Sequence, residues 1–213
     1  MDLKIKLLKK IIMNDDCATY LGAKGYTIYK ESLTVHEQEL IRRELTVRPF
    51  APKSSIAKPA SFPVYRESKK KFYVPRFYGI GTYGIPDGEK ISSGKDINLK
   101  FNGELRDFQK PIVDTYVKSA KNNECGLLEI HTGAGKTVMG LNIISKLKKK
   151  TIIIVHKDFL LRQWIERIEQ FLPDAKVGRI QGKILDIEDK DIVIGMLQSI
   201  AMKEYPPEVF SDF

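Results

Sequence analysis

The sequence predicts an α/β domain with a mostly parallel sheet over residues 97–213, preceded by a small basic α+β module over residues 1–96. Three observations indicate this division. Downstream of about residue 100, short apolar runs alternate with amphipathic helical patterns, which is typical of a parallel sheet with helices between its strands. A glycine-rich loop stands between one such run and one such helix. The surplus of positive charge is confined to the first half of the chain.

The elements of the downstream domain are expected in the order helix, strand, helix, strand, helix, strand, strand. The first helix is expected from Leu105 to Lys121, with Pro111 early enough in it to be tolerated. Strands are expected at residues 126–130, 151–155, 176–180 and 191–195, and the intervening helices at residues 136–149 and 159–172. The run Thr-Ile-Ile-Ile-Val at residues 151–155 is of the kind that is buried on both faces of a parallel sheet.

The first half of the basic module carries weaker local patterns. Residues 1–16 have the spacing of a short amphipathic helix. Thr34 and Glu37 form a possible capping box that opens a helix through about Leu45. A proline-rich connector is expected over residues 49–63.

The second half of the module is rich in aromatic residues. Residues 63–74 predict a β-hairpin with a basic turn, and residues 76–84 suit loops or edge strands rather than a helix. Aromatic side chains between positions 72 and 83 are interleaved with Lys71 and Arg76. Such a mixture can stack on bases and clamp phosphates, or it can pack a small β core beneath basic rims. The sequence leaves both interpretations open.

The charge distribution favours an anionic partner for the basic module. Residues 1–100 hold 19 Lys and Arg against 11 Asp and Glu, whereas residues 101–213 hold 17 against 16. A phosphate backbone is the simplest anionic partner for such a segment, and a solvated, solubilising surface is the alternative.

Several classes of protein are disfavoured by composition. No run of 18 apolar residues is present, and the N-terminal residues lack the apolar core of a secretory signal, so we expect no membrane span and no secretion. The two cysteines, Cys17 and Cys125, form no metal-ligand pattern with the three histidines. A reduced intracellular compartment is therefore expected.

The strongest chemical signal is the heptapeptide His131-Thr-Gly-Ala-Gly-Lys-Thr137. Its two glycines permit a tight turn that aims backbone N–H groups at phosphate oxygens. Lys136 would reach the β- and γ-phosphates, and the Thr137 hydroxyl would bind Mg²⁺. His131 is expected to be a spacer, and Ile130 occupies the position of the leading glycine of the general phosphate loop. The candidate phosphate-binding residues are His131, Thr132, Gly133, Ala134, Gly135, Lys136 and Thr137.

This loop resembles motif I of superfamily 2 helicases, in the branch that lacks the leading glycine. Upstream, Leu105-Arg-Asp-Phe-Gln109 is similar to that branch's L-R-x-aromatic-Q element. The resemblance implies that Arg106 and Gln109 belong to the ATP site, with the Gln109 amide reading the donor–acceptor edge of adenine.

Later segments resemble the nucleic-acid-binding elements of the same family. Residues 152–164 are similar to motif Ia, with His156-Lys157 in place of the family's Pro-Thr and with Gln163 in its Gln-Trp pair. Gly178-Arg-Ile-Gln-Gly182 and Gly195-Met-Leu-Gln-Ser199 look like the subsequent strand-binding elements. The residues expected to contact nucleic acid are therefore His156, Lys157, Gln163, Gly182, Gln198 and Ser199.

The resemblance implies a RecA-like domain of an ATP-dependent helicase or translocase, a hydrolase that uses ATP and Mg²⁺, with Lys136 as its catalytic residue. Its expected partner is nucleic acid, with DNA favoured over RNA. The family's acidic motif II and its second RecA-like domain do not occur in residues 1–213, so this segment alone is expected to hydrolyse ATP poorly. A P-loop enzyme of another class and a nucleic-acid-binding module with a vestigial P-loop are the alternatives.

Overall fold

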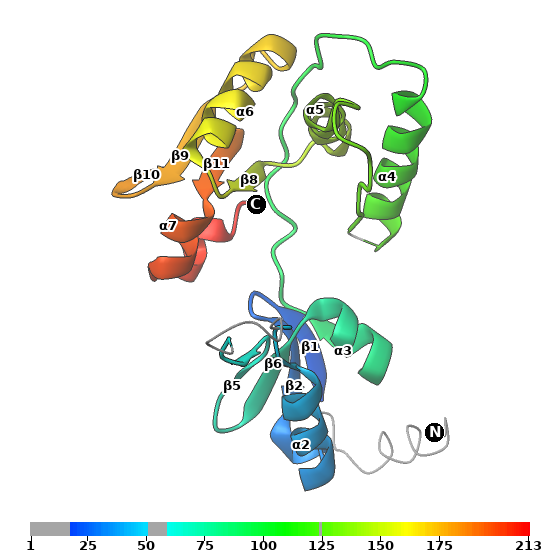
Figure 1. The fold of residues 1–213 in the computed structure, drawn as a ribbon, viewed down its shortest axis with the longest axis vertical. Helices are drawn as coiled ribbons and strands as arrows, with labels where there is room; N and C mark the ends of the chain where they lie inside the picture. The colour runs from blue at the N-terminus through cyan, green and yellow to red at the C-terminus, as the bar shows by residue number, and fades with distance from the viewer. Residues whose placement is uncertain (1–17, 51–58, 124) are drawn as a thin grey trace. The chain divides into compact units, whose positions relative to one another are not determined.

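The chain divides into two compact units, with the division between Ile91 and Ser92 (Figure 1). The computed structural model describes residues 18–50, 59–123 and 125–213. The helix expected at residues 1–16 and most of the proline-rich connector lie outside these ranges.

The N-terminal unit is built on a five-stranded sheet in the order β5-β6-β2-β1-β7. Its neighbouring strands are antiparallel except β1 and β7, which run parallel. The hairpin expected at residues 63–74 is confirmed as β5 and β6, although its first strand is shorter than expected. A separate pair, β3 and β4, is also antiparallel. The strands are β1 Thr19–Gly22, β2 Gly25–Tyr29, β3 Thr46–Val47, β4 Phe62–Pro63, β5 Arg66–Glu67, β6 Lys71–Val74 and β7 Gly88–Glu89.

Helix α2, Val35–Glu44, begins where the sequence predicts it. The Thr34 side chain accepts a hydrogen bond from the Glu37 N–H, and the Glu37 carboxylate accepts one from the Thr34 N–H, so the capping box is complete. The short 3₁₀-helix η1, Lys30–Ser32, precedes it. Helix α2 packs its buried Ile41 into the core of this unit.

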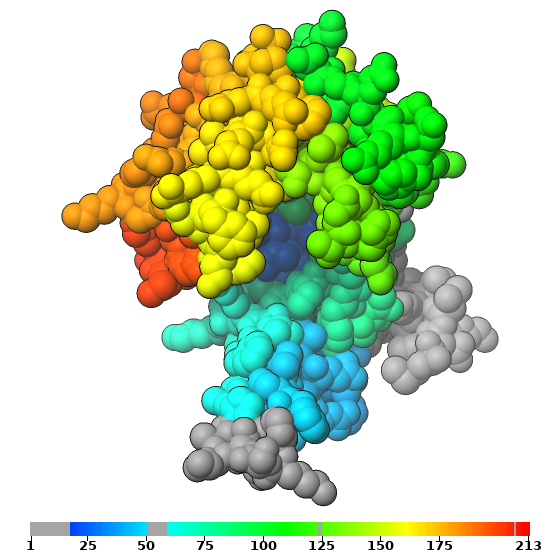
Figure 2. Space-filling view, turned by 45° about the horizontal axis from the view of Figure 1, so that its top comes forward, coloured from blue at the N-terminus to red at the C-terminus, as the bar shows by residue number. Residues whose placement is uncertain are grey.

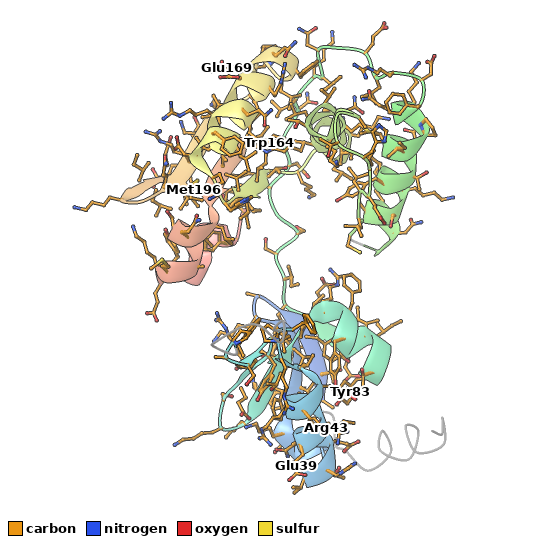
Figure 3. The ribbon with its side chains drawn as sticks, viewed as in Figure 1. Glu39, Arg43, Tyr83, Trp164, Glu169 and Met196 are labelled. Carbon is orange, nitrogen blue, oxygen red and sulfur yellow. The ribbon has the colours of Figure 1, made fainter. Side chains whose placement is uncertain are left out.

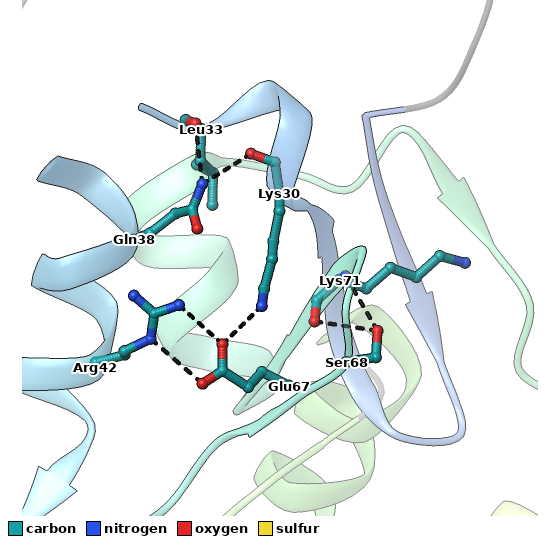
Figure 4. Close-up of polar contacts among 7 residues, drawn as sticks. All are labelled: Lys30, Leu33, Gln38, Arg42, Glu67, Ser68 and Lys71. Atoms are coloured by element: carbon teal, nitrogen blue, oxygen red, sulfur yellow. Dashed lines mark hydrogen bonds and ion pairs between the residues drawn. The ribbon is translucent and has the colours of Figure 1, made fainter. Parts of the chain in front are cut away.

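A carboxylate shared by two cations ties α2 to the β5–β6 hairpin (Figure 4). Glu67 of β5 accepts hydrogen bonds from Arg42 of α2 at 3.0 Å and from Lys30 at 2.8 Å. These hydrogen bonds, from Arg42 first and then Lys30, lower the pKa of Glu67. The side chain of Lys71 extends away from this cluster.

The prediction that residues 76–84 form loops or edge strands is wrong, because residues Arg76–Tyr83 form helix α3. Pro75 starts the helix, and Gly84, with φ of +90°, ends it. Gly79 lies directly against the ring of Tyr26, which is fully buried. Packing on this ring stabilises a helix that its two interior glycines, Gly79 and Gly81, disfavour.

We expect Gly79→Ala to destabilise the N-terminal unit by about 2 kcal/mol or more, because its methyl group would enter the space of the Tyr26 ring. Gly81→Ala is the matched control in the same helix. A Cβ at position 81 has no neighbour within 4 Å, so this change should stabilise the unit by about 0.5 kcal/mol. Urea unfolding of both variants measures the difference, and equal midpoints would contradict the packing described here.

Two tyrosines of α3 make the N-terminal unit sensitive to alkaline pH. Burial, with Glu37 and Glu44 nearby, raises the pKa of Tyr83 to about 12. Burial and a hydrogen bond donated to Glu44 also raise the pKa of Tyr78. Because an unfolded tyrosine ionises near pH 10, the stability contributed by Tyr83 is complete below about pH 10 and is lost as the pH rises toward 12.

The expected result is a urea midpoint that falls between about pH 10 and pH 12, with a smaller fall in Tyr83→Phe, which cannot ionise. Unfolding at a series of pH values, followed by circular dichroism, compares the two proteins. An identical fall in both would remove Tyr83 as a cause.

The C-terminal unit contains a four-stranded sheet in the order β10-β9-β11-β8, which confirms the expected α/β class. Strands β8, β11 and β9 are parallel, and β10 is antiparallel to β9. The β9–β10 hairpin, whose second strand the sequence analysis missed, projects from the edge of the sheet (Figures 1 and 2). The strands are β8 Thr151–Val155, β9 Val177–Gln181, β10 Ile184–Asp186 and β11 Ile192–Met196.

Helices α5 and α6 cover one face of this sheet, where their apolar residues form a core with β8 and β11. Trp164 of α6 lies toward α5 and contacts it at Gly140 (Figure 3). Helix α4 packs on α5 through Val113 and Met139. The helices are α4 Gln109–Asn123, α5 Lys136–Leu147, α6 Asp158–Phe171, α7 Leu197–Met202 and the 3₁₀-helix η2 Pro207–Phe210. None of the helices in the described ranges is both long and apolar enough to cross a bilayer.

The segment that leads into the C-terminal unit is anchored at the ends of two helices. The Ile97 N–H donates to the Lys148 carbonyl after α5, and the Asn102 N–H donates to the Phe171 carbonyl at the end of α6. The rings of Phe101 and Phe171 stack with their centroids 5.5 Å apart. Residues 95–102 therefore belong to the C-terminal unit.

Three expectations for this unit are wrong. Residues 126–130 form no strand, and Leu127 is 88% exposed, because an apolar run becomes a strand only where it pairs with another. Helix α4 begins at Gln109 rather than Leu105. Strand β8 is not buried on both faces, since Ile154 is 54% exposed on the face opposite α5 and α6.

Candidate nucleotide-binding site

The glycine-rich loop leads directly into the N-terminus of α5. Gly133 and Gly135 both have left-handed backbones, with φ of +86° and +84°, which only glycine adopts at little cost. Gly135 is the N-cap, and the helix begins at Lys136. The first N–H groups of a helix have no intrahelical acceptor and lie at the positive end of its dipole. The loop therefore presents an anion-binding helix terminus.

Gln109 supports this loop from beneath. Its side chain is 3% exposed, and its amide nitrogen donates to the Ala134 carbonyl at 2.7 Å. Its amide oxygen accepts from the Arg106 N–H at 3.0 Å. A Cβ at Gly135 would lie 2.6 Å from the Gln109 amide nitrogen, so the loop also fits closely over this side chain. The structure thus places Gln109 against the loop, whereas Arg106 contacts Gln109 through its backbone N–H and its side chain is exposed.

The polar side chains of the loop lie at its surface. The Lys136 ammonium group donates to the His131 carbonyl at 3.0 Å, so the lysine folds back across the loop. His131 and Thr132 are exposed, and Thr137 is half-buried on the first turn of α5. A phosphate placed at the helix terminus would meet this ammonium group within the reach of its flexible side chain.

A mostly apolar hollow of about 540 Å³ lies between α4 and residues 126–130. It is lined by Pro111, Ile112, Thr115, Tyr116, Ser119, Gly126, Leu127, Glu129 and Ile130. None of the candidate ATP-binding residues lines it, and it is therefore separate from the phosphate loop.

A second group of candidate residues meets where the three parallel strands end. The Gln198 amide donates to the His156 carbonyl at 3.0 Å, which joins the ends of β11 and β8. The Gly182 N–H donates to the Ser199 hydroxyl at 2.9 Å, which joins the ends of β9 and β11. Ligands of open parallel sheets bind at this carboxyl edge.

The remaining two candidates for nucleic-acid contact are placed differently. Lys157 is the exposed N-cap of α6, next to His156 at the strand edge. Gln163 is exposed farther along α6, and no described contact joins it to the group.

The sequence analysis missed two polar residues at the strand edge. Lys203 donates a hydrogen bond to the Gly182 carbonyl, and the Gln181 amide donates to the Asp158 carboxylate at 2.9 Å. The hydrogen bond from Gln181, together with the nearby Arg162, lowers the pKa of Asp158, although burial opposes the shift. The position of Gln181 at the end of a predicted strand was a signal that could have identified it.

A family model described as "Type III restriction enzyme, res subunit" (ResIII) matches residues 102–211, just over half of the chain. The chain belongs to the ResIII family. The match begins upstream of α4 and includes both the phosphate loop and the strand edge.

Two relatives and one solved structure show where this ResIII chain is similar to other proteins. "Putative ATP-dependent RNA helicase L396" of Acanthamoeba polyphaga mimivirus is 33% identical over 94% of this chain and 40% of its own length. "DNA 3'-5' translocase XPB2" of Sulfurisphaera tokodaii is 41% identical over 39% of this chain and 18% of its own. The solved "Sulfolobus solfataricus SWI2/SNF2 ATPase core in complex with dsDNA" matches 52% of this chain and 24% of that chain, with a TM-score of 0.41 and 20% identity.

The resemblance to superfamily 2 helicases is confirmed at the level of the family, because the relatives of this ResIII chain are named as helicases and translocases. The chain spans less than half the length of these two relatives. The alignment with L396 extends over most of the N-terminal unit as well as the ResIII region.

Proposed function

We propose that the ResIII region binds ATP and is the nucleotide-binding part of an ATP-dependent helicase or translocase. The observation that supports this most directly is the shape of the phosphate loop. Two left-handed glycines and the hydrogen bond from the buried Gln109 fix the loop at the N-terminus of α5. A loop that is already shaped loses little conformational entropy when it binds phosphate.

Each loop residue has a distinct part in this proposal. The backbone N–H groups of the first turn of α5 would bind the phosphate oxygens. Lys136 would exchange the His131 carbonyl for the β- and γ-phosphates. The Thr137 hydroxyl, a hard oxygen donor on that first turn, would supply one ligand to Mg²⁺, with phosphate and water oxygens as the others.

The strand edge is the proposed contact with the nucleic-acid track. Its backbone and side-chain polar groups are suited to a phosphodiester backbone rather than to base edges. We favour DNA over RNA as the track. The names of the relatives include both an RNA helicase and a DNA translocase.

Titration of a fluorescent ATP analogue into the chain, with competition by unlabelled ATP, tests nucleotide binding. We expect competition by ATP and a loss of affinity when Mg²⁺ is removed with EDTA. Absence of any competition by ATP would refute the proposal. Adding single-stranded DNA and single-stranded RNA in separate titrations measures the coupling between the two sites.

The coupling must be reciprocal if both ligands act on one motor. An oligonucleotide that changes ATP affinity by some factor has its own affinity changed by ATP by the same factor. ATP turnover with and without each oligonucleotide then shows whether coupling extends to hydrolysis. ATP binding without any effect of either oligonucleotide would leave a nucleotide-binding domain but not a motor.

A further inference from the structure

The two faces of the N-terminal sheet differ in what covers them. The buried residues of α2 and the half-buried Tyr78 and Tyr83 of α3 pack against Tyr26 and Phe72, so both helices lie on the same face of the sheet. The strand register identifies the residues of the opposite face, because paired residues share a face and successive residues of a strand alternate between faces. We define it as the tyrosine face, and its members are Tyr20, Thr27, Tyr29, Arg66, Lys71 and Tyr73.

The members of the tyrosine face form two rows across the sheet. In the first row, Tyr20 is paired with Thr27, and Tyr73 lies between Thr27 and Arg66. In the second row, Tyr29 is paired with Lys71. The three tyrosines are half-buried, unlike Phe72 and Tyr26 on the core-facing side, which are fully buried.

Cations lie over the tyrosine rings, and the rings of Tyr20 and Tyr29 contact each other with their centroids 6.3 Å apart. The Lys71 ammonium group is 4.4 Å from the Tyr29 ring centroid and donates to the Tyr20 hydroxyl at 3.3 Å. Lys90 lies 4.4 Å from the Tyr20 centroid, and Lys24 lies 5.2 Å from the Tyr73 centroid. Hydrogen bonds with Tyr29 first and then Tyr20 raise the pKa of Lys71 above its ordinary value.

The carboxylates of these strands are on the other side. Glu67 is paired with Phe72 and Glu89 with Leu21, so both share the core-facing side. Figure 4 shows the Lys71 side chain directed away from Glu67. A hollow of about 330 Å³ continues the tyrosine face at its edge and is lined in part by Lys24, Arg66 and Tyr73. Among the described strand residues, this face is therefore basic without acidic neighbours.

We propose that the tyrosine face binds single-stranded nucleic acid: the flexible lysines that lie over Tyr20, Tyr29 and Tyr73 would leave the rings to bind phosphates, together with Arg66, and bases would stack on the rings. Aromatic platforms with basic rims bind single strands because every unpaired base offers a stacking face. A duplex hides those faces within its own stack. This site is in the N-terminal unit and does not depend on the proposed nucleotide site.

The structure divides the aromatic residues of positions 72–83 between two faces of the sheet. Phe72, Tyr78 and Tyr83 belong to the core of the unit, and the Tyr78 hydroxyl donates to Glu44 at 2.7 Å. Lys71 and Tyr73 are on the opposite face, where Tyr20 and Tyr29 of distant sequence segments join them.

Fluorescence anisotropy of the full chain with a labelled oligothymidylate, an oligouridylate and a DNA duplex of equal length tests the site. We expect both single strands to bind more tightly than the duplex. Four cations, Lys24, Arg66, Lys71 and Lys90, would contribute about −3 to the slope of log affinity against log salt, and any cations of the ResIII strand edge that contact the strand would add to it. Equal binding of duplex and single strands would overturn the stacking proposal.

Substitutions separate stacking from charge. Tyr73→Ala should weaken single-strand binding by about tenfold without changing the salt slope, whereas Tyr73→Phe, which keeps the ring, should bind as the parent does. Changing both Lys71 and Lys90 to Gln should reduce the magnitude of the slope by about 1.4. Phe77→Ala, an exposed aromatic of α3, and Arg43→Gln on α2 (Figure 3) are matched controls and should change neither quantity.

Photo-crosslinking locates the bound strand independently of the ResIII region. An oligonucleotide with 5-iodouracil should crosslink to peptides that contain Tyr20, Tyr29 or Tyr73, and the yield should be unchanged in a Lys136→Ala background. Crosslinks confined to residues 92–213, with unaltered binding in the Tyr73→Ala and double lysine variants, would overturn the site. That result would leave the proposed function intact, and a failure of ATP binding would leave this site intact.

Discussion

Replacing Lys136 with alanine should weaken ATP binding by about 100-fold, which corresponds to roughly 3 kcal/mol. The side chain is a flexible cation at the helix terminus, and its charge-assisted hydrogen bonds to phosphate are replaced by nothing in the variant. Within the described residues its ammonium group donates to the His131 carbonyl of the exposed loop and to no other group, so its removal should not unfold the domain. Titration of a fluorescent ATP analogue into both proteins measures the loss.

Lys146→Ala is the control for the loss of one positive charge from the same helix. Lys146 lies in the last turn of α5, where it pairs with Asp114 of α4 at 2.7 Å. An exposed ion pair of this kind contributes little to stability, so this variant should bind ATP as the parent does. Equal ATP affinity in Lys136→Ala and the parent would contradict the assignment of the phosphate loop.

Replacing Gln109 with glutamate should damage the loop itself. The carboxylate has the shape of the amide and can still accept from the Arg106 N–H, but it cannot donate to the Ala134 carbonyl. Two acceptors would then face each other at a position that is 3% exposed. We expect a loss of about 2 kcal/mol in stability and at least about tenfold in ATP affinity. Thermal unfolding and nucleotide titration measure the two effects.

Gln109→Ala distinguishes support of the loop from recognition of the base. In the described contacts the amide uses one N–H and one oxygen lone pair within the protein, which leaves one of each for adenine. An equal fall in ATP and GTP affinity assigns Gln109 to the loop alone. A larger fall for ATP adds adenine reading to its role. No fall for either nucleotide would contradict both assignments.

Much of the ResIII fold follows from local sequence patterns. Strands β8 and β11 are short runs rich in β-branched residues, and the glycines of the loop before α5 supply the positive φ angles that its tight turn needs. The α2 capping box was equally clear, because both of its hydrogen bonds join residues three positions apart.

The features that escaped prediction depend on residues far apart in the sequence. Helix α3 is stabilised by Gly79 against Tyr26, a contact that no local pattern reveals. The amide of Gln109 donates a hydrogen bond to the carbonyl of Ala134, 25 residues away, so its role in supporting the loop could not be deduced from sequence spacing. The residues of the tyrosine face could be identified only from the strand register, since Phe72 and Tyr73 are neighbours in sequence but lie on opposite sides of the sheet.

The anchoring of residues 95–102 determines where mechanical load would enter the ResIII region. A pull on this segment would act at the C-terminal ends of α5 and α6, through the hydrogen bonds to Lys148 and Phe171. The phosphate loop is at the opposite end of α5, whose 12 residues span about 18 Å. A pull on residues 95–102 would therefore act first on the stacked rings of Phe101 and Phe171 and on the end of α5 that is one helix length from the phosphate loop.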